Sequence, residues 1–183
     1  MVLDELEEFW RLAASLKQEP RRGWMQRFRP RRVESVADHS FAVALLSLFE
    51  GERRGYDMEK MLKLALIHDL EEAITGDLTP GDKKRMTPTN VSREKDLAIA
   101  RTLARIPQRI RKDYRELWKD LRSATSKEAR LVKDLDRLEM ALQAKEYARR
   151  GVDSSKLRDF YSSAAREIKD GSLKRILQRI GAP

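Results

Sequence analysis

The sequence predicts an all-α protein, a compact single-domain helical bundle that spans residues 1–183. Apolar residues recur at intervals of three and four along almost the whole chain, as on one face of a helix, and alternating strand-like runs are hard to find. Cap and turn residues separate these periodic segments. A chain of 183 residues has the usual length of one domain and can bury on the order of 70% of the surface that its unfolded state exposes.

The N-terminal half contains three predicted helices and a loop. Pro20 follows the first helix, and Gly51 ends the second. Asp57 can cap the third helix, which Gly76 then breaks. The loop holds two glycines and two prolines, so it could act as a lid or a binding loop. The predicted segments are a helix over residues 3–16, a helix over 36–49, a helix over 58–74 and a loop over 76–90.

The C-terminal half is predicted to be helical as well. Pro107 suits the first turn of a helix. Thr125 and Glu128 have the spacing of a capping box, which would open a long helix that ends at about residue 150, before Gly151. Further helices are predicted over residues 91–105, 154–169 and 172–180.

Composition narrows the function classes only a little. The net charge of +9 favours anionic partners, but 38% of the residues are charged and the two signs are interspersed, as on any well-solvated helical surface. The chain has no cysteine, which excludes disulfides and thiolate metal sites and fits a reducing compartment. No apolar run approaches the ~20 residues of a membrane span, and the acidic first ten residues are unlike a signal peptide. We therefore expect a cytoplasmic protein that does not enter the membrane.

The chain contains two histidines, and each stands beside an aspartate in an apolar helical stretch. The pairs are Asp38-His39 and His68-Asp69. Burying such groups costs several kcal/mol unless they are hydrogen-bonded or bind a metal. A single histidine of this kind is more often a satisfied core residue. For two such histidines, each with an acidic neighbour, a metal site and a pair of hydrogen-bonded core residues are about equally well supported.

Two glutamates follow the second pair. On a continuous helix Glu72 lies one turn beyond His68 and Asp69, so the three side chains can border one face. A carboxylate there could move protons for a metal-bound water or for a leaving group. For Glu71 we expect the ordinary alternative, a solvated helix edge.

A metal held by two imidazoles and one carboxylate calls for another oxygen ligand, and the long predicted helix offers Asp134, Asp136 and Glu139. Its apolar stripe, which we expect to face the core, consists of Leu131, Leu135, Leu138 and Leu142. The two aspartates flank this stripe on opposite sides. Periodicity therefore cannot choose between them.

Three segments of the sequence, ESVADHS, ALIHDLEEAITGD and VKDLDRLEMALQAKEY, closely resemble the three motif segments of the HD-domain superfamily, in the order of that family. They are most similar to its nucleoside 5′-monophosphatase branch (5′-deoxynucleotidase, oxetanocin-like), over roughly residues 20–150. The resemblance implies a helical fold and a homodimer. It also implies a divalent metal held by His39, His68, Asp69 and Asp136. Sulfur-free ligands of this kind are compatible with Mn²⁺, Co²⁺, Fe²⁺, Zn²⁺ or Mg²⁺.

The same resemblance implies roles for residues around the metal. Glu72 corresponds to a proton-transfer residue, and Asp77 to an aspartate that helps to form the nucleotide site. Trp24, in the segment RRGWMQRFRPRR, corresponds to a substrate-binding tryptophan, and either Arg22 or Arg27 to a substrate-binding arginine. Read without the family, these six arginines and two aromatic residues also suit a nucleic-acid surface or an exposed basic loop.

The predicted function is a metal-dependent phosphohydrolase that releases phosphate from (deoxy)nucleoside 5′-monophosphates, with a nucleotide as its small-molecule partner. One alternative is another HD phosphohydrolase, acting on nucleoside triphosphates, cyclic nucleotides or alarmones. The other is a basic helical module that binds nucleic acid, which needs neither the metal ligands nor Glu72. The sequence contains no P-loop and no Gly-x-Ser-x-Gly motif near a histidine.

Overall fold

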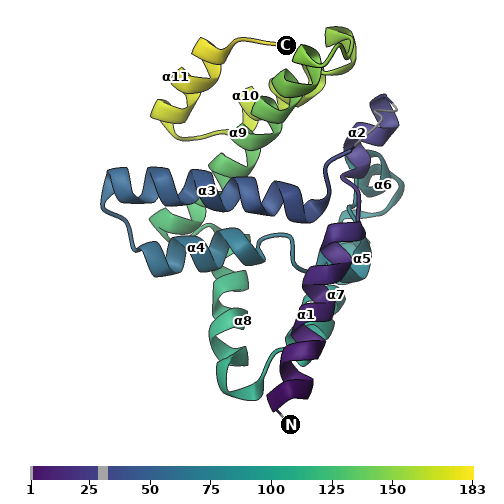
Figure 1. Cartoon of the computed structure of the whole chain (residues 1–183), viewed down its shortest axis with the longest axis vertical. Coiled ribbons are helices and arrows are strands. Elements are labelled where there is room, and N and C mark those ends of the chain that lie inside the picture. Colours follow the sequence, from purple (N-terminus) through teal and green to yellow (C-terminus); the bar gives the residue numbers. More distant parts are fainter. Residues whose placement is uncertain (1, 29–32) are drawn as a thin grey trace.

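The computed structural model describes residues 2–28 and 33–183, and in this part of the chain it confirms the all-α prediction (Figure 1). An isolated bridge between Pro20 and Ser35 is the only β-type pairing among these residues. The helices are α1 (Val2–Gln18), α2 (Arg22–Arg27), α3 (Val36–Arg54), α4 (Met58–Ile67), α5 (Glu72–Thr75), α6 (Pro80–Arg85), α7 (Pro88–Ala104), α8 (Gln108–Ser123), α9 (Lys127–Arg149), the short 3₁₀ helix η1 (Ser154–Lys156), α10 (Arg158–Glu167) and α11 (Gly171–Ile180).

The core is built around α9, which packs against α3, α4, α8, α10 and α11. Its predicted apolar stripe is buried as expected, with Leu135 fully inaccessible and Leu142 partly buried at the edge. Helices α3 and α4 lie side by side and run in opposite directions, and α1 packs against α3 and α5 (Figure 1). The elements that carry the two histidines and the acidic residues of α9 therefore meet in the middle of the bundle.

Local capping fixes where these helices begin. Ser35 and Asp38 form a capping box at the start of α3, which sets the position of His39 in the first turn. Asp57 caps α4, as predicted, by accepting a hydrogen bond from the Lys60 amide. The predicted capping box at Thr125 is wrong: Ser126 is the cap of α9 and accepts from the Ala129 amide.

Two expected segments differ from the structure. The predicted helix over residues 58–74 is interrupted, because α4 ends at Ile67 and residues 68–71 form turns before the short helix α5. This break turns the chain at His68, beside the other candidate ligands. The predicted loop over 76–90 contains a helix of its own, α6, and α7 already begins at Pro88.

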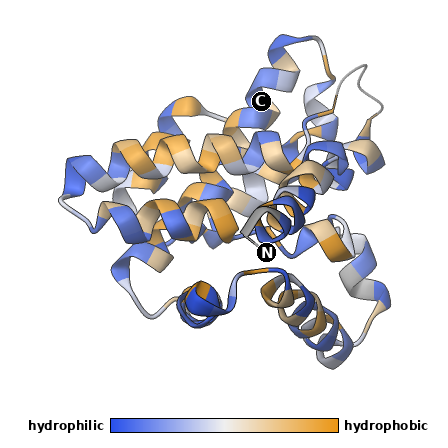
Figure 2. Cartoon of the chain, turned by 60° about the horizontal axis from the view of Figure 1, so that its bottom comes forward, coloured by the Kyte–Doolittle hydropathy of each residue, from blue (hydrophilic) through white to orange (hydrophobic). Residues whose placement is uncertain are grey.

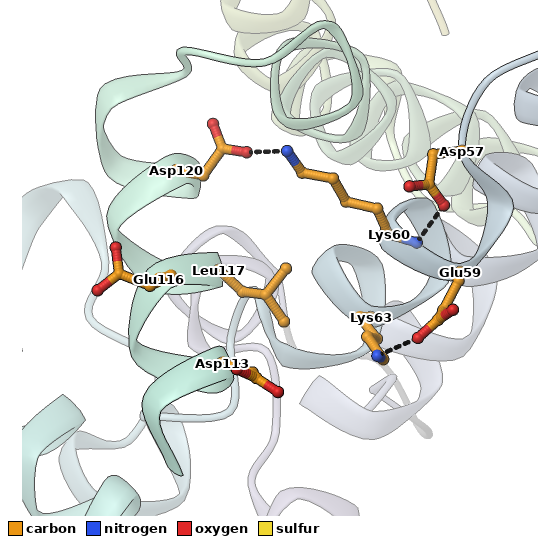
Figure 3. A pocket seen from close by; sticks show the side chains of 8 residues that line it. All are labelled: Asp57, Glu59, Lys60, Lys63, Asp113, Glu116, Leu117 and Asp120. Carbon is orange, nitrogen blue, oxygen red and sulfur yellow. Dashed lines mark hydrogen bonds and ion pairs between the residues drawn. The ribbon is translucent and has the colours of Figure 1, made fainter. Parts of the chain in front are cut away.

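An ion pair links α8 to α4 across a hollow of about 470 Å³ (Figure 3). The Lys60 ammonium lies 2.7 Å from an Asp120 carboxylate oxygen, and Asp120 also accepts hydrogen bonds from the amide and hydroxyl of Ser126. Neither histidine lines this hollow, so it is separate from the candidate site.

Among the described residues, no helix combines the length and the apolar character needed to cross a bilayer.

Candidate metal centre

Four of the predicted ligands converge from three elements. The Nε2 atom of His39, on α3, lies 3.3 Å from Nε2 of His68, in the turn after α4. The Asp136 Oδ1 atom, on α9, lies 3.2 Å from the His39 Nε2 atom. Asp69 completes the group, with its Oδ2 atom 3.3 Å from His68 Nε2 and 3.8 Å from His39 Nε2.

The hydrogen bonds of the imidazoles fit a metal site. The other ring nitrogen of each histidine has an acceptor: Nδ1 of His39 lies 2.6 Å from Oε2 of Glu139, and Nδ1 of His68 lies 2.7 Å from the carbonyl oxygen of Ala65. Protons on both Nδ1 atoms leave the two Nε2 lone pairs facing one another, beside two carboxylates. Such outer acceptors commonly fix the tautomer of metal-binding histidines, so this donor set fits a divalent cation.

The structure separates the two aspartates that periodicity left open. Asp134 points to the other side of α9, where its Oδ2 atom accepts hydrogen bonds from the amides of Lys169 (3.0 Å) and Asp170 (2.7 Å). It therefore anchors the segment between α10 and α11. Of the two, only Asp136 faces the histidines.

His39 and Asp136 each stabilise the charged form of the other. Burial and the charge of Arg21 oppose protonation of His39, but hydrogen bonds to Asp136 and Glu139 prevail and raise its pKa to about 10. Burial raises the pKa of the Asp136 carboxyl, yet the hydrogen bond to His39 and the charge of Arg137 hold it well below its ordinary value. The carboxylates are thus ionised and ready to accept a cation, which would compete with protons for the imidazoles.

Glu72 lies at the edge of this group and differs from the other carboxylates. Burial, followed by the charges of Asp69 and Asp77, raises the pKa of Glu72 to about 10, against the opposing charge of Arg21. Its Oε2 atom is buried without a hydrogen-bond partner among the described residues. A carboxyl group that keeps its proton at neutral pH can serve as a proton donor.

Arg21, which no motif or helical pattern in the sequence indicated, provides the positive charge beside these acids. One guanidinium nitrogen, Nη1, lies 3.1 Å from an Asp69 oxygen and 3.9 Å from oxygens of both Glu72 and Asp77. The bridge between Pro20 and Ser35 holds Arg21 next to the start of α3, through a hydrogen bond from the Arg21 amide to the Glu34 carbonyl. The bridge joins Pro20 to Ser35 across the segment between α1 and α3. Helical periodicity reports only residues three or four apart, so it could not predict this pairing.

The two arginines that the sequence favoured form ion pairs with residues other than the four candidate ligands. Arg22 pairs with Glu19 at 3.0 Å, and Arg27 pairs with Asp159 at 2.6 Å, and both side chains are about half exposed. Substrate binding by Arg22 or Arg27 stays a prediction, and Arg21 is a further candidate because it contacts Asp69 directly. Arg29, Arg31 and Arg32 of the same segment lie outside the described residues.

Trp24 is buried, with 2% of its surface exposed, in an aromatic cluster with Phe28, Tyr147 and Phe160. Its indole nitrogen donates a 2.7 Å hydrogen bond to Glu34. The indole is therefore not an open surface on which a sugar could stack. It forms part of the wall behind His39 and Glu139, because a Glu34 carboxylate oxygen lies within 4.8 Å of both groups.

Asp77 lies against Arg21, with a carboxylate oxygen 3.9 Å from the guanidinium group, and its amide donates a hydrogen bond to Glu19. The preceding glycine makes this turn possible. Gly76 has a φ of +69°, and a Cβ there would lie 2.6 Å from the Arg22 guanidinium.

The expectation for Glu71 is wrong. Only 4% of its surface is exposed, because α7 covers α5 and brings the Lys95 ammonium to 3.6 Å from a Glu71 oxygen. Burial, followed by the charge of Asp69, raises the pKa of the Glu71 carboxyl.

Known proteins are similar to this chain in sequence and in fold. A family model described as the HD domain matches residues 13–176. The chain belongs to the HD domain family. The human protein named 5′-deoxynucleotidase HDDC2 is 33% identical over 177 residues, which cover 97% of this chain and 85% of that protein. The Dictyostelium discoideum protein of the same name is 32% identical over 166 residues, which cover 85% of this chain and 86% of that protein.

Solved structures agree in fold. A protein of Pyrococcus horikoshii has a TM-score of 0.77 at 31% identity, and the match covers 96% of this chain and 98% of that chain. A conserved hypothetical protein of Pyrococcus furiosus has a TM-score of 0.75 at 32% identity, covering 94% and 96%. The predicted metal-dependent phosphohydrolase of Magnetospirillum magnetotacticum, at 22% identity and a TM-score of 0.69 over 97% and 92%, supports the fold alone.

Proposed function

We propose that the protein is a metal-dependent phosphohydrolase that releases phosphate from (deoxy)nucleoside 5′-monophosphates. The convergence of His39, His68, Asp69 and Asp136 around one point is the observation that carries this proposal. Relatives named 5′-deoxynucleotidases that align with nearly the whole chain support the substrate class.

These four residues would hold one divalent ion, and Glu139 and the Ala65 carbonyl would orient the imidazoles that face it. When bound, such an ion polarises a phosphoryl oxygen and lowers the pKa of water from about 15.7 toward 7. The donor set, two imidazoles and two carboxylates, accepts Mn²⁺, Co²⁺, Fe²⁺, Zn²⁺ or Mg²⁺.

The surrounding residues would handle charge and protons. Arg21 is placed to neutralise charge on the phosphoryl oxygens as the ester bond breaks. Glu72, a buried carboxyl group whose pKa is raised, would donate a proton to the departing 5′-oxygen of the nucleoside. Both groups lie beside Asp69, so the proton donor and the guanidinium group would act next to the candidate metal position.

Asp77 is proposed to accept a hydrogen bond from the sugar, in a pocket that offers no partner to a 2′-hydroxyl. Trp24 is buried behind His39 and Glu139, so it would support the wall of the site and not touch the sugar itself. A buried hydroxyl without a partner costs about 1–3 kcal/mol, which corresponds to roughly 5- to 150-fold discrimination. We therefore expect deoxyribonucleotides to be the better substrates. A cytoplasmic location and a single domain over residues 1–183 remain predictions from the sequence.

A panel of substrates tests this proposal. Phosphate release should be measured with nucleoside mono-, di- and triphosphates, cyclic nucleotides and an alarmone, each with several divalent metals. Deoxyribonucleoside 5′-monophosphates should give the highest kcat/KM. Release of pyrophosphate or triphosphate from a nucleoside triphosphate would instead place the chain in another branch of the family, and equal rates on the deoxy and ribo forms would remove the sugar preference.

We also propose that two copies of the chain associate through the exposed face of α3 and the adjoining face of α4. Residues 39–49 contain no Asp, Glu, Lys or Arg in a chain that is 38% charged. Large apolar side chains on these two helices are 36–65% exposed: Phe41, Leu45, Leu48, Phe49 and Leu66. Figure 2 colours much of the ribbon of these two helices as hydrophobic.

These five side chains expose on the order of 400–500 Å² in total, about half of the area that one partner buries in a standard interface. An apolar surface of this extent suits a second copy of the chain, because association through residues 39–49 brings no charged side chains of that segment together between two proteins of charge +9. Sedimentation equilibrium of Leu45→Glu tests this, with Trp10→Glu, another exposed apolar residue, on α1, as the control. The parent and the control should be dimers and Leu45→Glu a monomer, and a monomeric parent would refute the idea.

A further inference from the structure

The Asp136 carboxylate has two oxygens with different surroundings. The Oδ1 atom faces His39 Nε2 at 3.2 Å, whereas the Oδ2 atom lies 3.2 Å from Nη1 of Arg137, the next residue on α9. One oxygen is thus directed at the candidate metal position, and the other is held by a guanidinium group.

Arg137 is in turn held by another helix. Its Nε atom lies 2.6 Å from Oε2 of Glu167, the last residue of α10. The second oxygen of Glu167, Oε1, accepts a 2.8 Å hydrogen bond from the Ser163 hydroxyl, one turn earlier on α10. Both carboxylate oxygens of Glu167 are therefore occupied, and the guanidinium group is held at two of its nitrogens.

Exposure limits what this chain of contacts contributes to folding. The side chains of Arg137 and Glu167 are 36% and 46% exposed, and ion pairs at such positions contribute little to stability in water. The two ion pairs can still orient side chains, because contacts to two carboxylates fix the plane of the Arg137 guanidinium group. The consequence should therefore appear in the geometry of Asp136 rather than in the stability of the fold.

We propose that Arg137 is a positioning residue of the metal centre, which holds Asp136 so that a single oxygen faces the imidazoles, and that Glu167 of α10 keeps Arg137 in place. This inference rests on the proposed function for the presence of a metal. It adds that α10, which supplies none of the four candidate ligands, contributes to how tightly the metal is held. Replacing outer partners of metal ligands typically weakens metal affinity by about 10–100-fold.

The test is titration of the metal-stripped protein with Co²⁺. Calorimetry measures the affinity, and visible absorption reports the geometry of the bound ion. Arg137→Met should weaken binding by about 10–100-fold and alter the Co²⁺ spectrum, because Asp136 becomes free to turn both oxygens toward the ion. Arg137→Lys, which keeps the charge but not the two-sided contact, should recover only part of the affinity. Glu167→Gln should have a smaller effect in the same direction.

The double variant Arg137→Met/Glu167→Gln should bind Co²⁺ as Arg137→Met does, since Glu167 acts only through Arg137. The control is Arg149→Met, which removes an exposed arginine of α9 paired with Glu146, and it should leave both affinity and spectrum unchanged. All variants should melt at the temperature of the parent. Parental affinity and spectrum in Arg137→Met would overturn the inference while leaving the proposed function intact, whereas failure of the parent to bind any divalent ion would overturn both.

Discussion

The Nδ1 atom of His39 lies 2.6 Å from Oε2 of Glu139, a residue one hundred positions further along the chain. Both side chains are buried, with the imidazole fully inaccessible and Glu139 4% exposed. A carboxylate in this position fixes the tautomer of the ring and makes its Nε2 atom a stronger electron donor. We therefore expect Glu139 to influence how tightly the candidate ligands hold a metal.

Glu139→Gln should weaken metal binding by about 10–100-fold, because an amide accepts a weaker hydrogen bond from the imidazole than a carboxylate does. Calorimetric titration with Mn²⁺ measures the change. Glu146→Gln, an exposed position on the same helix, is the control and should bind as the parent does. Unchanged affinity in Glu139→Gln would show that the 2.6 Å contact has no influence on the metal.

Asp136→Asn should affect metal binding, whereas Asp134→Asn should affect stability. The first removes a candidate ligand and should abolish metal binding with little loss of stability. The second should keep the metal but lower the free energy of unfolding by roughly 1–3 kcal/mol, since Asp134 accepts the two backbone amides that lead into α11. Urea denaturation and metal titration of both variants separate these effects. Metal loss in Asp134→Asn alone would reverse the assignment.

Glu72→Gln should retain metal affinity and lower turnover by roughly 10²–10⁴-fold, because glutamine cannot donate the proton that Glu72 holds at neutral pH. Glu71→Gln is a close control: its carboxyl is also buried but contacts Lys95 instead of Arg21, so most of the turnover should remain. If Glu72→Gln loses the metal, Glu72 is a ligand. If turnover is unchanged, it is a bystander.

The residues that converge at the candidate metal centre were predictable because they are rare residues in a recognisable order. Two histidines, each beside an aspartate, and a later acidic helix resemble the HD-domain pattern closely enough to name His39, His68, Asp69 and Asp136. Periodicity alone could not separate Asp136 from Asp134, since both flank the same apolar stripe. Only the position of α10 and α11 decides which of the two faces the histidines.

The surroundings of the ligands were harder to predict, because they depend on pairings between distant segments. Arg21 reaches the site through the bridge between Pro20 and Ser35, which no helical pattern reveals. Glu71 is buried because α7 folds back over α5, although the local sequence reads as a solvated edge. Glu139 was noticed only as a spare carboxylate, yet its spacing of three from Asp136 places it one turn away on the same helix.

The ion pair between α4 and α8 provides a pH-dependent contribution to stability (Figure 3). Burial opposes ionisation of Asp120, but hydrogen bonds from Lys60 and Ser126 prevail and lower its pKa to about 2. Because the pKa is lower in the folded state, this contribution is present above the unfolded value of about 4 and disappears as the pH falls through 2.

Asp120→Asn should therefore lower the free energy of unfolding by roughly 1–2 kcal/mol at pH 7, and the deficit should vanish at about pH 2. Chemical denaturation of the parent and the variant from pH 7 to pH 2 measures both. Asp113→Asn, on the same helix and facing the same hollow, is the control. A deficit that stays constant over the whole range would mean that charge is not its source.

Phosphate release from deoxyadenosine 5′-monophosphate, measured before and after removal of metal, tests the central claim most directly. The chelated protein should release no phosphate, and added Mn²⁺ or Co²⁺ should restore release in the parent. His68→Ala should fail to recover at any metal concentration while its circular dichroism remains that of a helical protein. Equal release by the chelated and the metal-loaded parent, or normal turnover by His68→Ala, would contradict the account of a metal-dependent phosphohydrolase built on His39, His68, Asp69 and Asp136.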